Sequence, residues 1–253
     1  MLPIQVVSAR PTLAYFVGES AIATWSDLAV PTTGGPVMVK IVTAPREEPR
    51  PTVLILHGMP GIEHPLAAYV RYAEDLAAAG IDAWLFSYYS SADDEVMHRS
   101  GADQQIARFQ ARFHAWVKTV REIADFAQDR TANSGRTGLL GFSNGGFLAV
   151  GTAAVDPRIA ALVVFYGGIP EPMQDEITRL PPLLVLHGTA DRIIPVIEGE
   201  ALLVRARELG DEQAELVVYP DADHCFDFDP TSEIANEARA RAIAFLRSRL
   251  AAN

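Results

Sequence analysis

The sequence contains a single cysteine, Cys225, and no long hydrophobic run. One cysteine excludes a disulfide within the chain and fits a reducing compartment. No apolar run approaches the roughly 20 residues that a membrane-spanning helix needs. Residues 1–18 lack the basic start and apolar stretch of a signal peptide. We therefore expect a cytoplasmic protein that does not bind membranes.

Basic residues are also scarce, because 21 Lys and Arg stand against 32 Asp and Glu and give a formal net charge of −11. Nucleic acids and anionic membranes attract basic patches, so this balance argues against both partners. Apolar residues are plentiful and make up 49% of the 253 residues. This length fits one large α/β domain or two small ones. We expect a single domain over residues 1–253, with residues 1–25 as an N-terminal extension whose structure the sequence does not define.

From residue 52 onward, strand-like and helix-like patterns alternate. Short apolar runs predict strands at 52–56, 81–86, 137–140, 159–165, 183–186 and 215–219. Apolar side chains at three- and four-residue spacing predict helices over 65–79, 103–128, 144–154, 196–209 and 231–250. This alternation predicts a mostly parallel sheet with helices on both faces.

Other segments carry weaker patterns. Two β-rich runs at 26–30 and 37–42 flank a Gly/Pro turn and predict a hairpin. Residues 87–101 are polar and are expected to form a loop, while residues 133–135 are expected to end the helix that precedes them. The periodicity places Ile106 and Ile234 on the inward faces of their helices.

The segment Gly141-Phe142-Ser143-Asn144-Gly145 has the Gly-x-Ser-x-Gly spacing of a nucleophile elbow. It joins a predicted strand to a predicted helix. A serine at the apex of such a strained turn needs neighbours without side chains, and the turn lifts its hydroxyl above the sheet. The same five residues also fit a glycine-rich turn with a capping serine. Taken alone, the motif leaves both interpretations open.

Two further side chains, Asp191 and His224, follow strands at the carboxyl edge, where parallel sheets bind ligands. With Ser143 they give the order Ser, Asp, His, which is one of the known orders of a catalytic triad. His224 would accept the serine proton and return it to the leaving group, and Asp191 would orient the imidazole. Asp223 is an alternative partner for the histidine. It directly precedes His224, however, and adjacent side chains rarely point together.

Acyl transfer passes through a tetrahedral anion that N–H donors stabilise. The N–H of Asn144, which follows the candidate nucleophile, is one predicted donor. The second should come from the loop after the strand at 52–56. Pro60 in that loop has no N–H, so we predict Met59 as the second donor.

The remaining polar residues near these segments are expected to be structural. His57 and His187 each stand in a His-Gly pair at a strand end. The acidic residues around His224 lack the spacing of a calcium loop and are expected to form a solvated loop, with no metal site. They are Asp221, Asp223, Asp227 and Asp229.

Three segments together resemble the motif blocks of the dienelactone hydrolase family, within the α/β-hydrolase superfamily. They are Gly-Phe-Ser-Asn-Gly-Gly at 141–146, His-Gly-Thr-Ala-Asp-Arg-Ile-Ile-Pro at 187–195 and Tyr-Pro-Asp-Ala-Asp-His-Cys-Phe at 219–226. The resemblance extends over roughly residues 26–250. It implies an α/β-hydrolase fold with a mostly parallel eight-stranded sheet, no metal or organic cofactor, and hydrolysis of esters or lactones through an acyl-enzyme.

Two positions depart from the family pattern. Dienelactone hydrolases carry a cysteine nucleophile, where this chain has Ser143. They also place a glutamate in the loop after the third strand, where this chain has His57-Gly58-Met59. The resemblance therefore implies a serine esterase of the family rather than an enzyme for the dienelactone itself.

The expected substrate is a small or medium, partly apolar ester, thioester or lactone. Side chains expected to face it, each of which also fits an ordinary core position, are Met59, Tyr88, Tyr89, Phe142, Tyr166, Ile194 and Phe226. Two alternatives share the sequence features. An acyltransferase or cyclase would use the same triad, and a non-catalytic ligand-binding protein would share only the fold.

Overall fold

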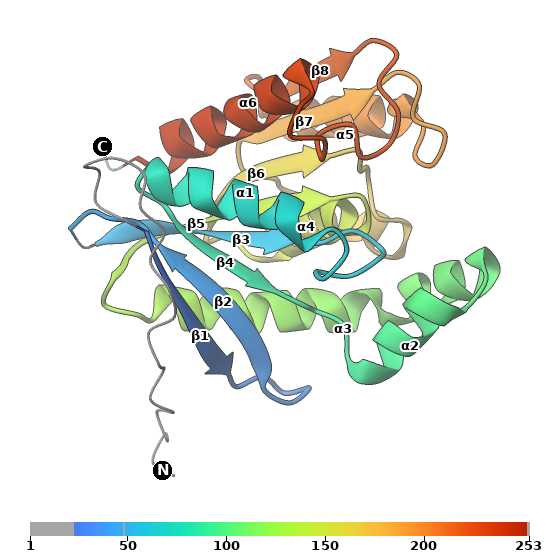
Figure 1. The fold of residues 1–253 in the computed structure, drawn as a ribbon. Coiled ribbons are helices and arrows are strands. Elements are labelled where there is room, and N and C mark those ends of the chain that lie inside the picture. The colour runs from blue at the N-terminus through green and yellow to red at the C-terminus, as the bar shows by residue number, and fades with distance from the viewer. Residues whose placement is uncertain (1–22, 48, 252–253) are drawn as a thin grey trace.

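The computed structural model describes residues 23–47 and 49–251 as helices packed on a central sheet (Figure 1). The sheet has eight strands in the order β1-β2-β4-β3-β5-β6-β7-β8. The strands are β1 (Thr24–Val30), β2 (Val37–Thr43), β3 (Arg50–Leu56), β4 (Asp82–Phe86), β5 (Asn133–Phe142), β6 (Ile159–Phe165), β7 (Leu183–Gly188) and β8 (Glu215–Tyr219). All pairings from β4 to β8 are parallel. The mostly parallel sheet predicted from the sequence is confirmed.

The hairpin predicted near the start is formed by β1 and β2, which pair antiparallel, and β2 pairs antiparallel with β4. Because β1 begins at Thr24, residues 24 and 25 belong to the sheet and not to the predicted N-terminal extension. Residues 1–22 of that extension lie outside the described residues.

Helices cover both faces of the sheet. They are α1 (Leu66–Ala78), α2 (Ser91–Arg99), α3 (Ala102–Gln128), α4 (Asn144–Val155), α5 (Val196–Glu208) and α6 (Glu233–Leu250), with a short 3-10 helix, η1 (Glu171–Glu176). Successive residues of a strand point to opposite faces, so Val163 of β6 shares a core with Tyr72 of α1, while Leu162 shares the other core with Phe113 of α3. No helix in the described part of the chain is long and apolar enough to cross a membrane.

The prediction of a loop at residues 87–101 is wrong, because residues 91–99 form α2. Ser90 caps this helix by accepting a hydrogen bond from the Asp93 N–H, and the Asp93 carboxylate accepts from the Ser90 N–H in return. Asp93 is buried and also accepts from the Trp116 indole at 3.0 Å and from Arg112 at 3.2 Å. The buried Asp93 carboxylate thus anchors α2. A search for apolar periodicity does not detect a helix that is held in this way.

Three smaller expectations also differ from the structure. Residues 133–135 begin β5, since Asn133 pairs with Arg50 of β3, and α3 has already ended at Gln128. Ile106 and Ile234 are 57% and 41% exposed and do not point into the core. Both lie near the amino ends of their helices, and Ile106 lines the cavity described below.

Candidate active site

Ser143 stands between β5 and α4 in a strained conformation, with φ of 53° and ψ of −119°. Its flanking glycines have no room for a side chain. A Cβ on Gly141 would lie 2.2 Å from the Gly145 carbonyl oxygen, and a Cβ on Gly145 would lie 2.2 Å from the Leu56 carbonyl oxygen. These clashes explain why the turn needs glycine at both positions, and they favour the nucleophile elbow over a plain capping turn.

The structure brings the three predicted triad residues into one hydrogen-bonded chain. His224 Nε2 lies 3.1 Å from Ser143 Oγ, and His224 Nδ1 lies 2.8 Å from Asp191 Oδ2. A carboxylate oxygen only accepts, so Nδ1 carries the proton in this contact and Nε2 is left to accept from the serine. This is the arrangement in which a histidine can act as general base toward a serine.

Asp191 is held in place by the backbone that follows it. Its Oδ1 accepts hydrogen bonds from the N–H groups of Ile193 at 2.9 Å and Ile194 at 2.8 Å. His187 lies on its other side, where its Nε2 contacts the Ile194 carbonyl oxygen at 2.8 Å. Burial lowers the pKa of His187, which favours a neutral ring with a structural role.

Asp223, the alternative partner of the histidine, does not contact its ring. Its carboxylate binds the Arg192 guanidinium and accepts from the His224 backbone N–H at 2.8 Å. The hydrogen bond from Arg192 lowers the pKa of Asp223 to about 2. Asp191 is therefore the acid that faces the imidazole.

The loop carrying the predicted oxyanion donor Met59 lies directly beside the elbow. A Cβ on Gly58 would lie 3.5 Å from the Ser143 Cβ. The N–H groups of Met59 and Asn144 donate no hydrogen bond to any described residue. For Asn144 this follows from its place at the start of a helix, where the first N–H groups have no partner within the helix. Both N–H groups are free to bind a substrate oxygen.

Three tyrosines support this loop. The Gly58 N–H donates to the Tyr69 hydroxyl at 3.0 Å, the Tyr88 hydroxyl donates to the His57 carbonyl at 2.8 Å, and the Tyr89 hydroxyl donates to the Met59 carbonyl at 3.3 Å. The loop is thus fixed by three hydrogen bonds to tyrosine hydroxyls.

His57 belongs to the same support. Its ring stacks on Tyr88 with centroids 4.0 Å apart, and its Nδ1 lies 2.8 Å from the Gly58 carbonyl oxygen. Complete burial lowers the pKa of His57 to about 4, so the ring is neutral at pH 7. These contacts favour the structural role expected from the sequence.

A cavity of about 550 Å³ opens above Ser143. Of the side chains expected to face it, Met59, Phe142, Tyr166 and Ile194 do line it. The prediction was wrong for three others, because Tyr88 and Tyr89 are buried behind the loop and Phe226 packs on Tyr219. The sequence analysis missed Tyr69, Ile106, Phe109, Phe147, Ile193 and Phe228. Ile106 and Phe109, which stand among polar residues near the start of α3, were a signal for two of them, since apolar helix residues without a core to cover can line a cavity.

The expectation of a solvated acidic loop fails at Asp227, which is 1% exposed. Its carboxylate accepts hydrogen bonds from the hydroxyls of Tyr72 and Tyr166, both at 2.7 Å. Tyr166 in turn packs on the His224 ring, with centroids 4.5 Å apart. Burial raises the pKa of Asp227 to about 6, although the two tyrosines oppose this shift. The acid therefore connects the loop carrying His224 to α1 and β6.

This burial predicts a specific dependence of stability on pH. The pKa of Asp227 is raised from 3.8 to about 6 in the folded protein, so stability falls between about pH 4 and pH 6, where this carboxyl is ionised in the unfolded chain but still protonated in the folded one. This group should lower the free energy of unfolding by about 2 kcal/mol between pH 4 and pH 7. Urea unfolding of wild type and Asp227→Asn at both pH values isolates the effect, because the other groups cancel in the difference. A difference that does not change with pH would contradict the assignment.

Cys225 lines the same cavity but is poorly suited to replace Ser143 as nucleophile. Partial desolvation of its thiol raises the pKa of Cys225 to about 12, with the Asp227 charge adding to the shift. The reactive form of cysteine is the thiolate, which is almost absent at neutral pH with such a pKa. In residues 23–47 and 49–251, no group of His, Cys, Asp and Glu side chains is arranged to hold a metal ion.

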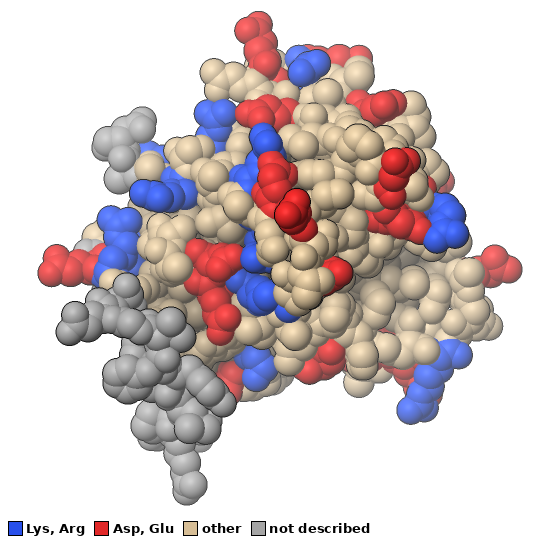
Figure 2. Space-filling model, turned by 45° about the horizontal axis from the view of Figure 1, so that its top comes forward, with Lys and Arg blue, Asp and Glu red and all other residues tan. Residues whose placement is uncertain are grey.

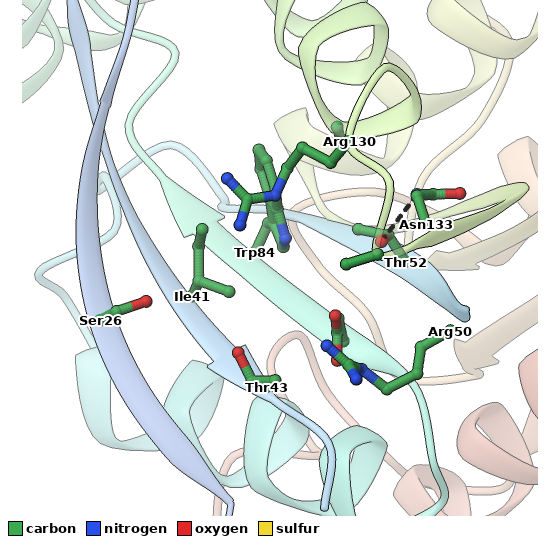
Figure 3. Close-up of a pocket in the computed structure, with 11 residues that line it drawn as sticks. Ser26, Ile41, Thr43, Arg50, Thr52, Trp84, Arg130 and Asn133 are labelled. Carbon is green, nitrogen blue, oxygen red and sulfur yellow. Dashed lines mark hydrogen bonds and ion pairs between the residues drawn. The ribbon is translucent and has the colours of Figure 1, made fainter. Parts of the chain in front are cut away.

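A second, smaller hollow of about 160 Å³ lies at the opposite edge of the sheet, at the amino ends of β3, β4 and β5 (Figure 3). Arg50 Nε donates to the Asp82 carboxylate there at 2.8 Å, and both side chains are buried. The Arg130 guanidinium lies over the Trp84 ring at 5.8 Å. These two contacts stabilise this edge of the sheet. The residues that line the hollow include no nucleophile paired with a base.

Comparison with known proteins agrees with this geometry. The model of the dienelactone hydrolase family matches residues 38–249. The chain belongs to the dienelactone hydrolase family. The match includes Ser143, Asp191 and His224 together with both oxyanion candidates, Met59 and Asn144.

Relatives of this dienelactone hydrolase family member occur in several bacteria. A Methylorubrum extorquens protein with the provisional name carboxymethylenebutenolidase is 26% identical over 240 residues, which cover 90% of this chain and 80% of the relative. A Salmonella typhimurium protein with the same provisional name is 33% identical over 116 residues, which cover 42% of this chain and 43% of the relative. In that match the chain spans less than half the length of the relative.

Solved structures of hydrolases share the fold of this family member. Dienelactone hydrolase from Anabaena variabilis aligns with a TM-score of 0.72 at 19% identity, covering 90% of this chain and 99% of that one. An esterase from Pyrobaculum calidifontis aligns with a TM-score of 0.68 at 21% identity, covering 90% and 86%. These alignments confirm the α/β-hydrolase fold predicted from the sequence.

Proposed function

We propose that this protein hydrolyses carboxylic esters or lactones through an acyl-enzyme on Ser143. The observation that carries the proposal is the hydrogen-bonded chain from Ser143 through His224 to Asp191 at the base of a cavity. Family membership supports the same chemistry, because the family is named for a lactone hydrolase. The name of the two relatives, carboxymethylenebutenolidase, likewise describes a lactone substrate, and that lactone also bears a carboxyl group.

The residues supply each step of such a reaction. Ser143 Oγ attacks the substrate carbonyl carbon while His224 Nε2 takes the serine proton. Asp191 stabilises the imidazolium that forms, and the N–H groups of Met59 and Asn144 bind the oxyanion. His224 then protonates the leaving alcohol. In the second half-reaction it activates a water that releases the acid.

Acyl transfer and ring closure use the same residues as hydrolysis and differ only in the group that accepts the acyl chain. A non-catalytic binder would not need a serine strained into a φ of 53° with a histidine 3.1 Å from its hydroxyl. The strained turn and the complete hydrogen-bonded chain therefore favour an enzyme over a binding protein.

Product analysis of p-nitrophenyl butyrate turnover tests the proposal. We expect the full chain to release butyric acid as the main product, both with and without an added alcohol. An ester of the added alcohol as the main product would assign acyl transfer instead. Absence of turnover, together with no labelling of Ser143 by a fluorophosphonate, would contradict a serine hydrolase.

A further inference from the structure

The cavity above Ser143 is apolar and carries no charged side chain of its own. Its lining contains no Lys, Arg, Asp or Glu among the described residues. Apolar side chains surround the space above the serine, including Met59, Ile106, Phe109, Phe147, Ile193 and Phe228. Gln105 also lines it, but its amide donates to the Met97 carbonyl at 2.9 Å.

Two basic side chains close to the cavity, those of Arg192 and His98, already have partners. Arg192 precedes Ile193 in the chain, but its guanidinium binds Asp223 and its side chain is 85% exposed. His98 lies behind the rim residue His64, with ring centroids 6.0 Å apart. Backbone carbonyls occupy both of its ring nitrogens, Asp94 O at 2.8 Å and Pro60 O at 2.7 Å.

The mouth of the cavity is apolar as well. Ile106 of α3 and Ile193 of the segment after β7 both line the cavity, and they are 57% and 69% exposed. Exposed apolar side chains at a rim mark a site for an apolar ligand. Acidic and basic side chains are interspersed on the face of the molecule seen in Figure 2, which shows no broad basic area.

We propose that the substrate is a neutral, apolar ester or lactone, and that esters and lactones carrying a carboxylate, such as the one in the relatives' name, are excluded. The proposal rests on the hydrolase function given above. A carboxylate entering this cavity would lose its hydration without gaining a cation. The net charge of −11 also opposes its approach. An alkyl or aryl group gains instead from burial against Phe109 and Phe147.

Two succinate esters that differ mainly in charge test this selectivity. Methyl p-nitrophenyl succinate is neutral, and p-nitrophenyl hemisuccinate ends in a carboxylate. At pH 8, where exposed imidazoles are neutral, we expect kcat/KM for the neutral ester to be larger by about 100-fold or more. Values within about threefold of each other would overturn the proposal.

A pair of variants locates the cause in the cavity. Ile193→Arg places a cation at the mouth. It should raise kcat/KM for the hemisuccinate and so lower the ratio of kcat/KM for the neutral ester to kcat/KM for the hemisuccinate by at least about tenfold. Ile197→Arg is the matched control, because Ile197 is 58% exposed and does not line the cavity. It adds the same charge and should leave the ratio unchanged. Equal narrowing in both variants, or none in Ile193→Arg, would contradict exclusion by the cavity.

Failure of the selectivity and failure of the hydrolase function give different results. Turnover of both esters at similar rates, lost in Ser143→Ala, would overturn only the selectivity. Turnover of neither ester, with Ser143 unlabelled, would overturn the function. If Ser143 is labelled without turnover, rates of labelling by a neutral alkyl fluorophosphonate and by one ending in a carboxylate give the comparison directly. The neutral probe should react faster, and equal rates would contradict the proposal.

Discussion

Replacing Ser143 with alanine should lower kcat for p-nitrophenyl butyrate by roughly 10⁵-fold or more. The change removes the only hydroxyl within hydrogen-bond distance of His224 Nε2 among the described residues. Loss of a triad nucleophile leaves only the contribution of the oxyanion donors and of binding. Alanine and serine tolerate a φ of 53° about equally, so the fold should persist. Steady-state kinetics with a thermal melt of each protein checks both statements.

Ser134→Ala provides the matched control for this experiment. Ser134 lies near the other end of β5, at the amino edge of the sheet and away from the cavity. The substitution should leave kcat within about twofold of wild type. If Ser143→Ala kept more than about one hundredth of the activity while folded, the serine could not be the nucleophile.

Asp191→Asn should lower kcat by about 10⁴-fold while leaving the site in place. Asp191 Oδ1 accepts two backbone N–H groups, so the amide oxygen of asparagine must take that position. The amide nitrogen then faces His224 Nδ1 and donates to it. That contact forces the proton onto Nε2, which can no longer accept the proton of Ser143.

Asp223→Asn separates this effect from a general loss of negative charge near the histidine. The Asp223 carboxylate binds Arg192 and the His224 backbone N–H, not the imidazole. Its replacement should change kcat by less than about tenfold. Similar losses in both variants would contradict the assignment of Asp191 as the orienting acid.

The sheet and the positions of the triad could be predicted because they depend on local pattern. A strand buried on both faces carries a continuous apolar run, as at residues 53–56 of β3 and 183–186 of β7, and such runs stand out between amphipathic helices. Parallel strands then bring residues after β5, β7 and β8 to one edge. The structure brings Ser143, Asp191 and His224 into hydrogen-bond contact there, and their catalytic roles stay predictions.

What could not be predicted depends on contacts between distant residues. Asp93 anchors α2 through Trp116, which lies 23 positions further along the chain. Asp227 is buried by Tyr72 and Tyr166, which come from separate elements, and an acidic neighbourhood in sequence gave the opposite expectation. The sequence also did not show which way the Tyr88 and Tyr89 side chains point, since an aromatic residue after a strand can face a cavity or support its wall.

The most direct test of the account is the site of covalent labelling by a neutral alkyl fluorophosphonate. Peptide mass spectrometry of the full chain should find one phosphonyl group, attached to Ser143. The Ser143→Ala variant should carry none, and labelling and loss of esterase activity should follow the same time course. Labelling on another residue such as Cys225, or full esterase activity with Ser143 unmodified, would contradict a serine hydrolase that acts through Ser143.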